Sequence, residues 1–445
     1  MTIQELKQIM ANAGDVGAGG AGFPSSVKLA EGADTLIINA AECEPLLYTD
    51  YFLMKKHMDR VLRGAEVLME AAGIHKGFLG VKKHTAERLN IQHGQQLSEH
   101  VQVYALPDVY PMGDEIVLIY EVLRRVVTPG SLPLTAGVLV FNVETLYNVE
   151  QAVDHGYPVA EKWITIGGKV KEPVVYRVPV GTPINELLVR AGVVIPEDCV
   201  IIDGGPAMGN IIDPETAVVT KTTKGLLILP AELPIIAGKV SPRHAVMGRA
   251  SSACCQCTLC TEMCPRALLG YPLEPHKAIR ISTYHLDENP QDYTTATLCS
   301  GCGVCELTAC CQGISPRRVF QEMKGVLAKN GLRYQHTGAP VKPNPDRDYR
   351  LLPIERFKSR IGVTPFDRVP AFDDSKWTPT HVTMNMKQHA GAPATPAVKV
   401  GDIVHKGDII GQAGQGISAM VHSSLDGTVT AVSDRAVTIS AKTGA

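Results

Sequence analysis

All but two of the twelve cysteines in this chain lie within residues 254–311, at spacings that suit a metal centre. The first run is Cys254-Cys-Gln-Cys257-Thr-Leu-Cys260-Thr-Glu-Met-Cys264-Pro265, which is a C-x2-C-x2-C-x3-C-P pattern. The second run repeats the first three spacings at Cys299, Cys302 and Cys305, and its fourth cysteine, Cys310, follows after one residue more. Three closely spaced thiolates of such a run bind one cubane, and the fourth binds its neighbour. The two runs therefore predict two [4Fe–4S] clusters and one-electron chemistry.

The order of the cysteines indicates which thiolates share a cluster. In a two-cluster ferredoxin arrangement, one cluster takes Cys254, Cys257, Cys260 and Cys310, and the other takes Cys264, Cys299, Cys302 and Cys305. Cys311 could replace Cys310, although the sequence 312–316 that follows fits Cys310 better. Structural zinc is the alternative metal, but zinc sites usually offer two C-x2-C pairs rather than triplets. Cys43 and Cys199 lie in apolar surroundings, and we expect buried, inert thiols there.

A glycine-rich segment near the start, Gly17-Ala-Gly-Gly-Ala-Gly-Phe-Pro24, is the second candidate for chemistry. Glycines let backbone N–H groups close around a phosphate, and Lys28 would add a positive charge. The alternative is a tight turn, because no clear strand precedes the segment as it does in a Rossmann fingerprint.

Composition excludes several classes of protein. Over 445 residues the hydrophobic content is 45%, the charged content 20% and the net charge −2, so no broad basic face is available for nucleic acid. Aromatic residues make up 5%, which argues against a stacking surface for single strands. We found neither a secretory signal nor a long apolar stretch, and we predict a cytoplasmic protein without direct membrane insertion, whose cysteines are not a disulfide framework.

The elements that must position these residues fall into several regions, which predicts an α/β multidomain fold. Apolar runs at 35–39 and 138–141, with helical stretches at 50–72 and 114–127, indicate an α/β domain. Alternating strands around the Gly-Gly turn at 167–168 indicate a β-grasp-like module, and residues 389–445 have the turns of a small all-β domain. The predicted domains are 1–158 for the Rossmann-like α/β domain, 159–235 for the β-grasp module, 245–330 for the ferredoxin-like α domain, 331–385 for a Pro-rich linker, and 386–445 for the β domain.

Several motifs, in order, resemble the flavin- and NADH-binding subunit of respiratory complex I and, more closely, the C subunit of Rnf-type electron-transport complexes. They are the glycine loop, Asn39-Ala-Ala-Glu42-Cys-Glu44-Pro45, Tyr110-Pro-Met-Gly113-Asp-Glu115 and Phe141-Asn142-Val-Glu144. The resemblance implies an FMN-binding domain with NADH as electron donor. The residues that it implies for FMN and nucleotide binding are Gly17, Gly19, Gly20, Gly22, Lys28, Asn39, Glu42, Glu44, Tyr110, Gly113, Glu115 and Asn142.

The resemblance extends over nearly the whole chain. Residues 164–230, with the loop Gly204–Gly209, are similar to the β-grasp (SLBB-like) module of this family, and residues 389–429 resemble the barrel-sandwich hybrid of Rnf C subunits. In Rnf C subunits that barrel lies at the N-terminus. Its place after the cysteines here is similar to the cobalamin reductases of the propanediol-utilisation microcompartment. This resemblance implies electron flow from NADH through FMN and two clusters to a corrinoid, with an adenosyltransferase and a microcompartment shell protein as partners.

Two other interpretations stay open. The chain could be the electron-input subunit of a membrane Rnf complex, or a non-enzymatic iron–sulfur relay. The relay is suggested by Ala18 and Ala41, which stand where the complex I pattern has Arg and Asp. No residue identifies a corrin pocket, and we interpret His389, His405 and His422 as surface histidines rather than cobalt ligands.

Overall fold

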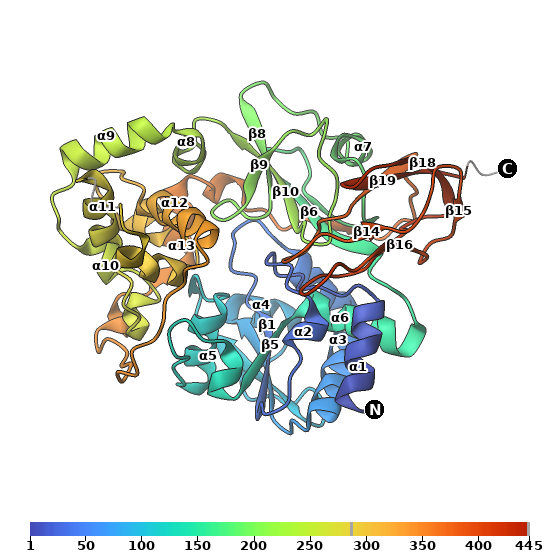
Figure 1. Ribbon diagram of the computed structural model, residues 1–445, viewed down its shortest axis with the longest axis horizontal. Coiled ribbons are helices and arrows are strands. Elements are labelled where there is room, and N and C mark those ends of the chain that lie inside the picture. The colour runs from blue at the N-terminus through green and yellow to red at the C-terminus, as the bar shows by residue number, and fades with distance from the viewer. Residues whose placement is uncertain (285–287, 443–445) are drawn as a thin grey trace.

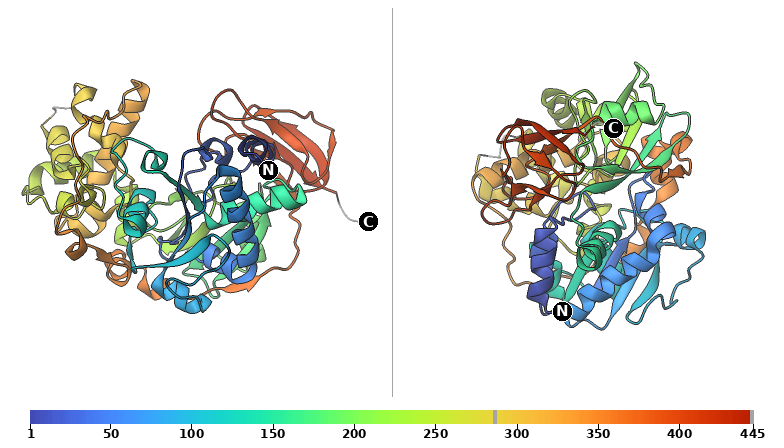
Figure 2. Two further views of the ribbon diagram at one scale, coloured as in Figure 1. Left: turned by 90° about the horizontal axis from the view of Figure 1, so that it is seen from below. Right: turned by 90° about the vertical axis from the view of Figure 1, so that its right-hand side faces the viewer.

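The computed structural model describes residues 1–284 and 288–442, so small parts of the predicted ferredoxin-like and β domains, 285–287 and 443–445, lie outside the described residues. Four regions can be distinguished in Figure 1: an α/β region, a second sheet above it, a helical region and a small β-barrel. Figure 2 shows a crescent in which the helical region and the barrel occupy opposite ends. The α/β region and the second sheet therefore lie between the cysteine-bearing helices and the barrel.

The α/β region is built on a parallel sheet in the order β3-β2-β1-β5. All of β1 is buried except the half-buried Asn39, as expected for a parallel strand covered on both faces. The strand order reverses between β1 and β5, and such a switch point is where open α/β sheets bind ligands. The elements are α1 (Ile3–Asn12), α2 (Ser25–Lys28), β1 (Thr35–Ala40), α3 (Thr49–Ala72), β2 (Gly77–Lys82), α4 (Lys83–Leu89), β3 (Val101–Leu106), β4 (Val109–Tyr110), α5 (Glu115–Leu123), η1 (Pro133–Ala136), β5 (Val138–Asn142) and α6 (Val143–His155).

The helix expected over residues 114–127 is shorter in the structure. Helix α5 ends at Leu123 because Arg124 adopts a left-handed conformation, with φ 57°, and its N–H bonds the Tyr120 carbonyl. The N-terminus of the same helix is capped by Asp114, whose carboxylate accepts a hydrogen bond from the Ile116 N–H at 3.0 Å. The cap fixes the start of the helix next to Gly113.

The second sheet has the order β12-β7-β6-β10-β8-β9, and its edge strand β12 (Ala371–Asp373) comes from much later in the chain. β10 runs parallel to β6, β12 runs parallel to β7, and the remaining pairs are antiparallel. Helix α7 packs on it through Ile184, Leu187 and Leu188. The elements are β6 (Glu161–Gly168), β7 (Val174–Pro179), α7 (Ile184–Arg190), β8 (Cys199–Asp203), β9 (Asn210–Ile212) and β10 (Gly225–Pro230).

The helical region carries both cysteine runs and shares one core with α5. Ile116 and Ile119 of α5 belong to the same buried cluster as Phe320 and Leu327 of α12. The apolar face of α5 thus anchors the cysteine-bearing helices to the α/β region. The elements are α8 (Pro234–Val240), α9 (Arg243–Ala253), α10 (Leu259–Glu262), η2 (Ala267–Leu269), α11 (Pro275–Thr283), η3 (Pro290–Leu298), η4 (Cys305–Ala309) and α12 (Pro316–Lys329).

Residues 331–385, predicted as a Pro-rich linker, contain regular structure that joins other regions. β11 pairs with β4, β12 extends the second sheet beside β7, and β13 belongs to the barrel. The prediction of an extended linker from the prolines is therefore wrong for these strands, although each of them is short. The elements are η5 (Arg347–Tyr349), β11 (Leu352–Pro353), α13 (Ile354–Ile361), η6 (Thr364–Phe366), β12 (Ala371–Asp373) and β13 (His381–Asn385).

The C-terminal barrel consists of two small sheets, β13-β19-β18-β15 and β14-β16-β17, around an aliphatic core. The interpretation of its histidines was partly wrong: His389 and His422 are buried, with 7% and 2% of their surface exposed, and only His405 lies at the surface. His389 is held by the Ala392 carbonyl and the Ala419 N–H. The remaining strands are β14 (Thr395–Pro396), β15 (Ile403–Val404), β16 (Ile409–Gln412), β17 (Val421–His422), β18 (Gly427–Val432) and β19 (Ala436–Ala441).

None of the helices in the described part of the chain combines the length and the apolar character needed to cross a bilayer.

Candidate functional site

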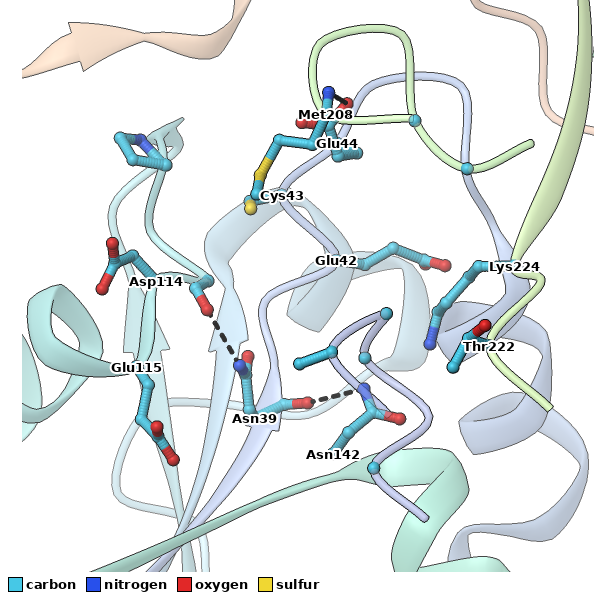
Figure 3. A pocket seen from close by; sticks show the side chains of 18 of the residues that line it. Asn39, Glu42, Cys43, Glu44, Asp114, Glu115, Asn142, Met208, Thr222 and Lys224 are labelled. Carbon is cyan, nitrogen blue, oxygen red and sulfur yellow. Dashed lines mark hydrogen bonds between the residues drawn. The ribbon is translucent and has the colours of Figure 1, made fainter. Parts of the chain in front are cut away.

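A cleft of about 600 Å³ lies at the carboxyl ends of β1 and β5, between the α/β region, the second sheet and the helical region. The glycine loop lines it, and the Gly204–Gly209 loop of the second sheet, which carries Met208, lies directly against Glu44 (Figure 3). Of the twelve residues predicted to bind FMN and nucleotide, all except Gly22 and Tyr110 line this cleft. The sequence motifs are thus brought together at the switch point of the sheet.

The glycine loop presents backbone donors to the cleft. Its ends are closed by hydrogen bonds from the Gly17 N–H to the Phe23 carbonyl and from the Gly22 N–H to the Gly17 carbonyl. The N–H groups of Gly19, Gly20 and Ala21 donate to no described residue, and all three residues line the cleft. Gly20 has φ +102°, and a Cβ there would meet open space. Free donors beside an open cradle fit a phosphate such as that of FMN.

Two asparagines fix the geometry at the strand ends. The Asn39 amide donates to the Gly113 carbonyl at 3.1 Å, and its oxygen accepts from the Ala41 N–H. The Asn142 amide donates to Asp50 Oδ2 at 2.9 Å, while its oxygen caps α6 through the Glu144 N–H. Figure 3 shows both side chains at the floor of the cleft. Because their amides are already bonded, they hold the strand ends in register rather than move freely.

A charged group at one wall was not predicted from the sequence. The Lys224 ammonium, just before β10, contacts Asp50 Oδ1 at 2.5 Å, and both side chains are almost fully buried. The carboxylate of Glu42 accepts hydrogen bonds from the N–H groups of Asp50 and Tyr51. Burial, followed by the charge of Asp50, raises the pKa of Glu42 to about 7. This wall can therefore hold or release a proton near neutral pH.

Lys28 and Glu115 form an ion pair at the opposite wall. Lys28 Nζ lies 2.5 Å from Glu115 Oε1 and 5.6 Å from the centre of the Phe141 ring. Both side chains are about one-third exposed, so the pair can open to admit a ligand at little cost.

Glu44 connects the cleft to the second sheet. Its Oε2 accepts hydrogen bonds from the N–H groups of Ala207 at 2.8 Å and Met208 at 3.4 Å. A Cβ on Gly205 would come within 2.1 Å of the same oxygen, so only glycine allows this approach. Burial raises the pKa of Glu44, followed by smaller, opposing effects of its hydrogen bonds. The Gly204–Gly209 loop is thus fastened over the cleft by one carboxyl group.

Tyr110 does not line the cleft, contrary to the prediction. Its ring stacks on Phe357 with centroids 4.0 Å apart, and only 3% of its surface is exposed. Its hydroxyl lies 2.7 Å from the Cys302 carbonyl oxygen and 3.0 Å from Glu44 Oε1. Tyr110 therefore supports the cleft from behind and links Glu44 to a cysteine of the second run.

Four cysteines from both runs lie together beside the cleft, and we call Cys264, Cys299, Cys302 and Cys305 the inner set. Burial raises the pKa of Cys264 to about 12, and the neighbouring Cys299 contributes further. Burial also raises the pKa of Cys305 well above its usual value, followed by the charges of Cys299, Glu306, Cys302 and Cys264. Cys302 and Ser300 line the cleft itself. The inner set thus touches the space into which the glycine loop opens.

The other four cysteines, Cys254, Cys257, Cys260 and Cys310, form the outer set. Burial raises the pKa of Cys260 to about 11, and the thiols of Cys310, Cys257 and Cys254 raise it further. The Ile314 N–H donates to Cys310 Sγ at 3.4 Å, whereas Cys311 is exposed. The structure thus groups the eight cysteines as a two-cluster ferredoxin would, with Cys310 turned inward; the ligand assignment itself stays a prediction.

The donor chemistry of both sets fits cubane clusters. Each set offers four thiols, and N–H groups such as that of Gly301, 3.3 Å from Cys299 Sγ, can stabilise thiolate charge. Among the described residues, no three His, Cys, Asp or Glu side chains meet closely enough to bind a single metal ion. In a cubane each thiolate binds a different iron, so the sulfurs surround a cluster instead of one point.

Arg266 and Cys43 are two further residues that line the cleft. Arg266 forms a two-pronged ion pair with Asp114, at 2.9 and 3.1 Å, and donates to the Leu298 carbonyl just before the second cysteine run. Cys43 lines the cleft, although we expected it in an apolar core, and burial raises its pKa to about 11. Sequence patterns could not reveal Arg266, Ser300 or Lys224, because they belong to segments far from the flavin-domain motifs.

Comparison with known proteins places these features in families. Residues 10–151 match the Nuo51 FMN-binding domain, residues 253–315 match a 4Fe-4S dicluster domain, and residues 374–445 match the RnfC barrel sandwich hybrid domain. The expected FMN-binding, iron–sulfur and barrel-sandwich domains are confirmed by these matches. The Rossmann-like and β-grasp descriptions stay predictions, although the parallel sheet is present.

Curated relatives match over very different lengths. The chain is 37% identical over 441 residues to cobalamin reductase PduS of Salmonella typhimurium, covering 99% of this chain and 97% of the relative. PduS of Citrobacter freundii is also 37% identical, at 98% and 96% coverage. The C subunit of the Na⁺-translocating ferredoxin:NAD⁺ oxidoreductase complex of Acetobacterium woodii is 32% identical over 271 residues, or 60% of this chain and 58% of the relative. Among solved structures, an NAD⁺-reducing [NiFe]-hydrogenase chain is 20% identical, with a TM-score of 0.46 and coverage of 75% of this chain and 63% of that one.

Proposed function

The chain belongs to the family of the cobalamin reductase PduS, and on that premise we propose that it passes electrons from NADH to a corrinoid. The similarity spans nearly the whole of both chains, so almost every part of the relative has a counterpart here. The single observation that carries the electron route is Cys302, which belongs to the inner set and also lines the cleft. The cleft and the proposed iron–sulfur region are thus directly adjacent at Cys302.

When bound, FMN and the clusters supply the conversion between hydride transfer, which moves two electrons, and single-electron transfer. The chain's own residues do the positioning. The free N–H groups of Gly19 and Gly20 would hold the phosphate, and Asn39 and Asn142 would set the floor on which a ring system lies. Lys28 and Glu115 would separate to admit the nucleotide. Glu42 and Glu44, which line the cleft, would lie near the nicotinamide nucleotide.

The two cysteine sets provide the outward part of the route. We propose that the inner set and the outer set each bind one [4Fe–4S] cluster, with the inner set next to the cleft. The inner thiols of Cys264, Cys302 and Cys305 are buried, whereas Cys257 of the outer set is exposed. The outer set is therefore the more open of the two to solvent.

An anaerobic titration tests the proposal. Stoichiometric NADH is expected to bleach flavin absorbance and to reduce the iron–sulfur chromophore, and catalytic amounts of protein are expected to reduce cob(III)alamin. Unchanged flavin absorbance after NADH addition would leave only the relay interpretation. Flavin bleaching without corrinoid reduction would favour another acceptor.

A second candidate is the electron-input subunit of a membrane Rnf complex. The match to the Acetobacterium woodii protein favours it, but that match covers 60% of this chain, compared with 99% for PduS. Activity of the isolated protein with NADH and a corrinoid would separate the two, because an Rnf subunit would act only together with its integral partners.

The finer assignments belong to the same proposal. We assign residues 1–158 to the flavin domain, 159–235 to a β-grasp (SLBB-like) module with helix α7, 245–330 to the two clusters, 331–380 to a connecting segment and the residues from β13 onward to the barrel. We further propose that the protein works inside a bacterial microcompartment for propanediol degradation, beside an adenosyltransferase and a shell protein. Co-purification of either partner with the tagged chain checks this.

A further inference from the structure

A second cavity, of about 370 Å³, shares one wall with the cleft but opens among different elements. The shared wall is the segment 42–47, and the remaining walls come from the end of β2, from α4 and from α13. We call this space the Lys82 cavity. Its size falls within the range of small-ligand sites, and none of the motifs considered above accounts for it.

Lys82 is the feature that sets this cavity apart. It lies at the carboxyl end of β2, only 2% of its surface is exposed, and it lines the cavity. No described residue accepts a hydrogen bond from its ammonium or forms an ion pair with it. Burial lowers the pKa of Lys82, against the opposing charges of Cys43, Asp108, Glu42 and Glu44. A buried, unpartnered ammonium is costly for the free protein, which indicates that an anion completes it.

The carboxylates around the cavity already form hydrogen bonds or ion pairs with other groups. Asp108 Oδ1 lies 2.5 Å from His84 Nδ1, and Asp367 pairs with Lys358 at 2.6 Å. Glu42 and Glu44 accept backbone N–H groups on the cleft side. Their charges act on Lys82 only from beyond ion-pair distance, and none of them accepts a hydrogen bond from its ammonium.

A second cation faces the same space without a carboxylate partner. Arg88 lies on α4, two turns beyond Lys82, with its guanidinium 6.0 Å from the centre of the Tyr48 ring. No described carboxylate forms an ion pair with it. Thr85 adds a hydroxyl to the same lining. The cavity thus offers an ammonium, a guanidinium and a hydroxyl.

We propose that the Lys82 cavity binds a phosphate group, separate from the phosphate of the flavin. A lysine point charge, an arginine fork and a hydroxyl suit a tetrahedral anion with several oxygens better than a planar carboxylate with two. The phosphate could be free in solution or could be the phosphodiester of a corrinoid nucleotide loop. The second source rests on the proposed function, whereas the first does not.

Thermal unfolding of the flavin-loaded protein tests free phosphate. Inorganic phosphate, compared with sodium chloride at equal ionic strength, is expected to raise the Tm of the wild type. Lys82→Met is expected to raise the Tm without phosphate, because it removes a buried charge, and to weaken phosphate binding about tenfold or more. Lys83→Met is the matched control, since Lys83 is exposed and does not line the cavity, and it should respond like the wild type.

Steady-state kinetics test the phosphodiester. For Lys82→Met, the KM for cobalamin is expected to rise about tenfold, and the KM for cobinamide, which lacks the nucleotide phosphate, should not change. The rate of NADH oxidation with a dye acceptor should stay at the wild-type value, so a loss of corrinoid reduction in every variant would count against the proposed function and not against the cavity. Arg88→Gln, on an exposed helix surface, gives the same readouts if Lys82→Met does not fold. Equal phosphate response and equal KM values in the wild type and both variants would overturn the proposal.

Discussion

The inner and outer cysteine sets use the same ligand chemistry in opposite surroundings. Cys264, Cys302 and Cys305 of the inner set are 8 to 9% exposed, whereas Cys257 of the outer set is exposed and its three companions are half-buried. Four thiolates around an iron–sulfur core carry net negative charge, which buried surroundings disfavour. The inner set lies among compensating groups. Burial raises the pKa of Cys299, and the Gly301 N–H together with three cations opposes that rise, these cations being Lys324, Arg266 and Arg317.

Position along the proposed electron route therefore decides how the charge of each set is stabilised. Beside the cleft, water would compete with hydride transfer, so fixed cations replace it. At the surface, water itself stabilises the charge and a partner can approach. Four predictions test this comparison.

The largest expected effect separates the two sets by function. Cys302→Ala and Cys257→Ala should each lower the iron content by about half, because we assign one of two clusters to each set, and both should retain flavin. In Cys302→Ala, NADH should no longer reduce the remaining iron, since the outer set is then cut off from the cleft. In Cys257→Ala, NADH should still reduce it. Anaerobic electron paramagnetic resonance and iron analysis measure this, and identical behaviour of the two variants would contradict the inner and outer order.

The second prediction concerns the ion pair next to the inner set. Arg317 Nη2 lies 2.5 Å from Glu306 Oε1, and both side chains are at most 6% exposed. Glu306→Gln should lower the free energy of unfolding by about 3 kcal/mol, because a guanidinium cannot lose its proton when its partner is removed. Chemical denaturation measures it.

The control for that prediction lies beside the outer set. Glu262 pairs with Arg350 at 2.9 Å, and both side chains are substantially exposed. Glu262→Gln should cost less than about 1 kcal/mol, because water screens the pair. Similar losses for the two variants would show that burial does not distinguish the sets.

A third prediction uses the spare thiols. Cys255 and Cys311 flank the outer set and are exposed, whereas Cys43 lies beside the inner set and burial raises its pKa to about 11. Iodoacetamide should therefore modify Cys255 and Cys311 at least about tenfold faster than Cys43 in the iron-loaded protein, because the thiolate is the nucleophile. Mass spectrometry after short exposure reads the sites. Early modification of Cys43 would mean that the cleft side is more open than the structure shows.

The smallest expected effect concerns the link between cleft and inner set. Tyr110→Phe removes the hydroxyl that bonds the Cys302 carbonyl at 2.7 Å. We expect a loss of about 1 kcal/mol in the free energy of unfolding, with iron and flavin content unchanged. Phe357→Leu, which removes the stacked ring but keeps the hydroxyl, is the companion variant. If Tyr110→Phe loses iron, the hydroxyl is required to hold the inner set.

The sequence predicted local chemistry well and distant contacts poorly. The residues of each cysteine run and of the glycine loop are close together in the sequence, so these motifs can be recognised without knowing the fold. The Lys224–Asp50 pair and the Glu44–Ala207 bond join residues from different regions, and no periodicity encodes such contacts. His389 and His422 were misjudged for the same reason, because the neighbours that bury them come from elsewhere in the chain. The segment 331–385 was interpreted as a linker because its prolines flank strands of only two to five residues.

That segment has a consequence for how such proteins can be rearranged during evolution. β12 pairs with β7 in a sheet whose other strands lie much earlier in the sequence. A second contact also joins the two ends of the chain: the Lys221 ammonium donates hydrogen bonds to the carbonyls of Gly14 and Met420. Until residues 371–373 emerge from the ribosome, β7 has a bare edge that can recruit other chains. A gene fusion or truncation that separated β7 from β12 would thus leave an unpaired, aggregation-prone strand edge. Domain rearrangement is therefore expected to succeed only where β7 and β12 stay in the same protein.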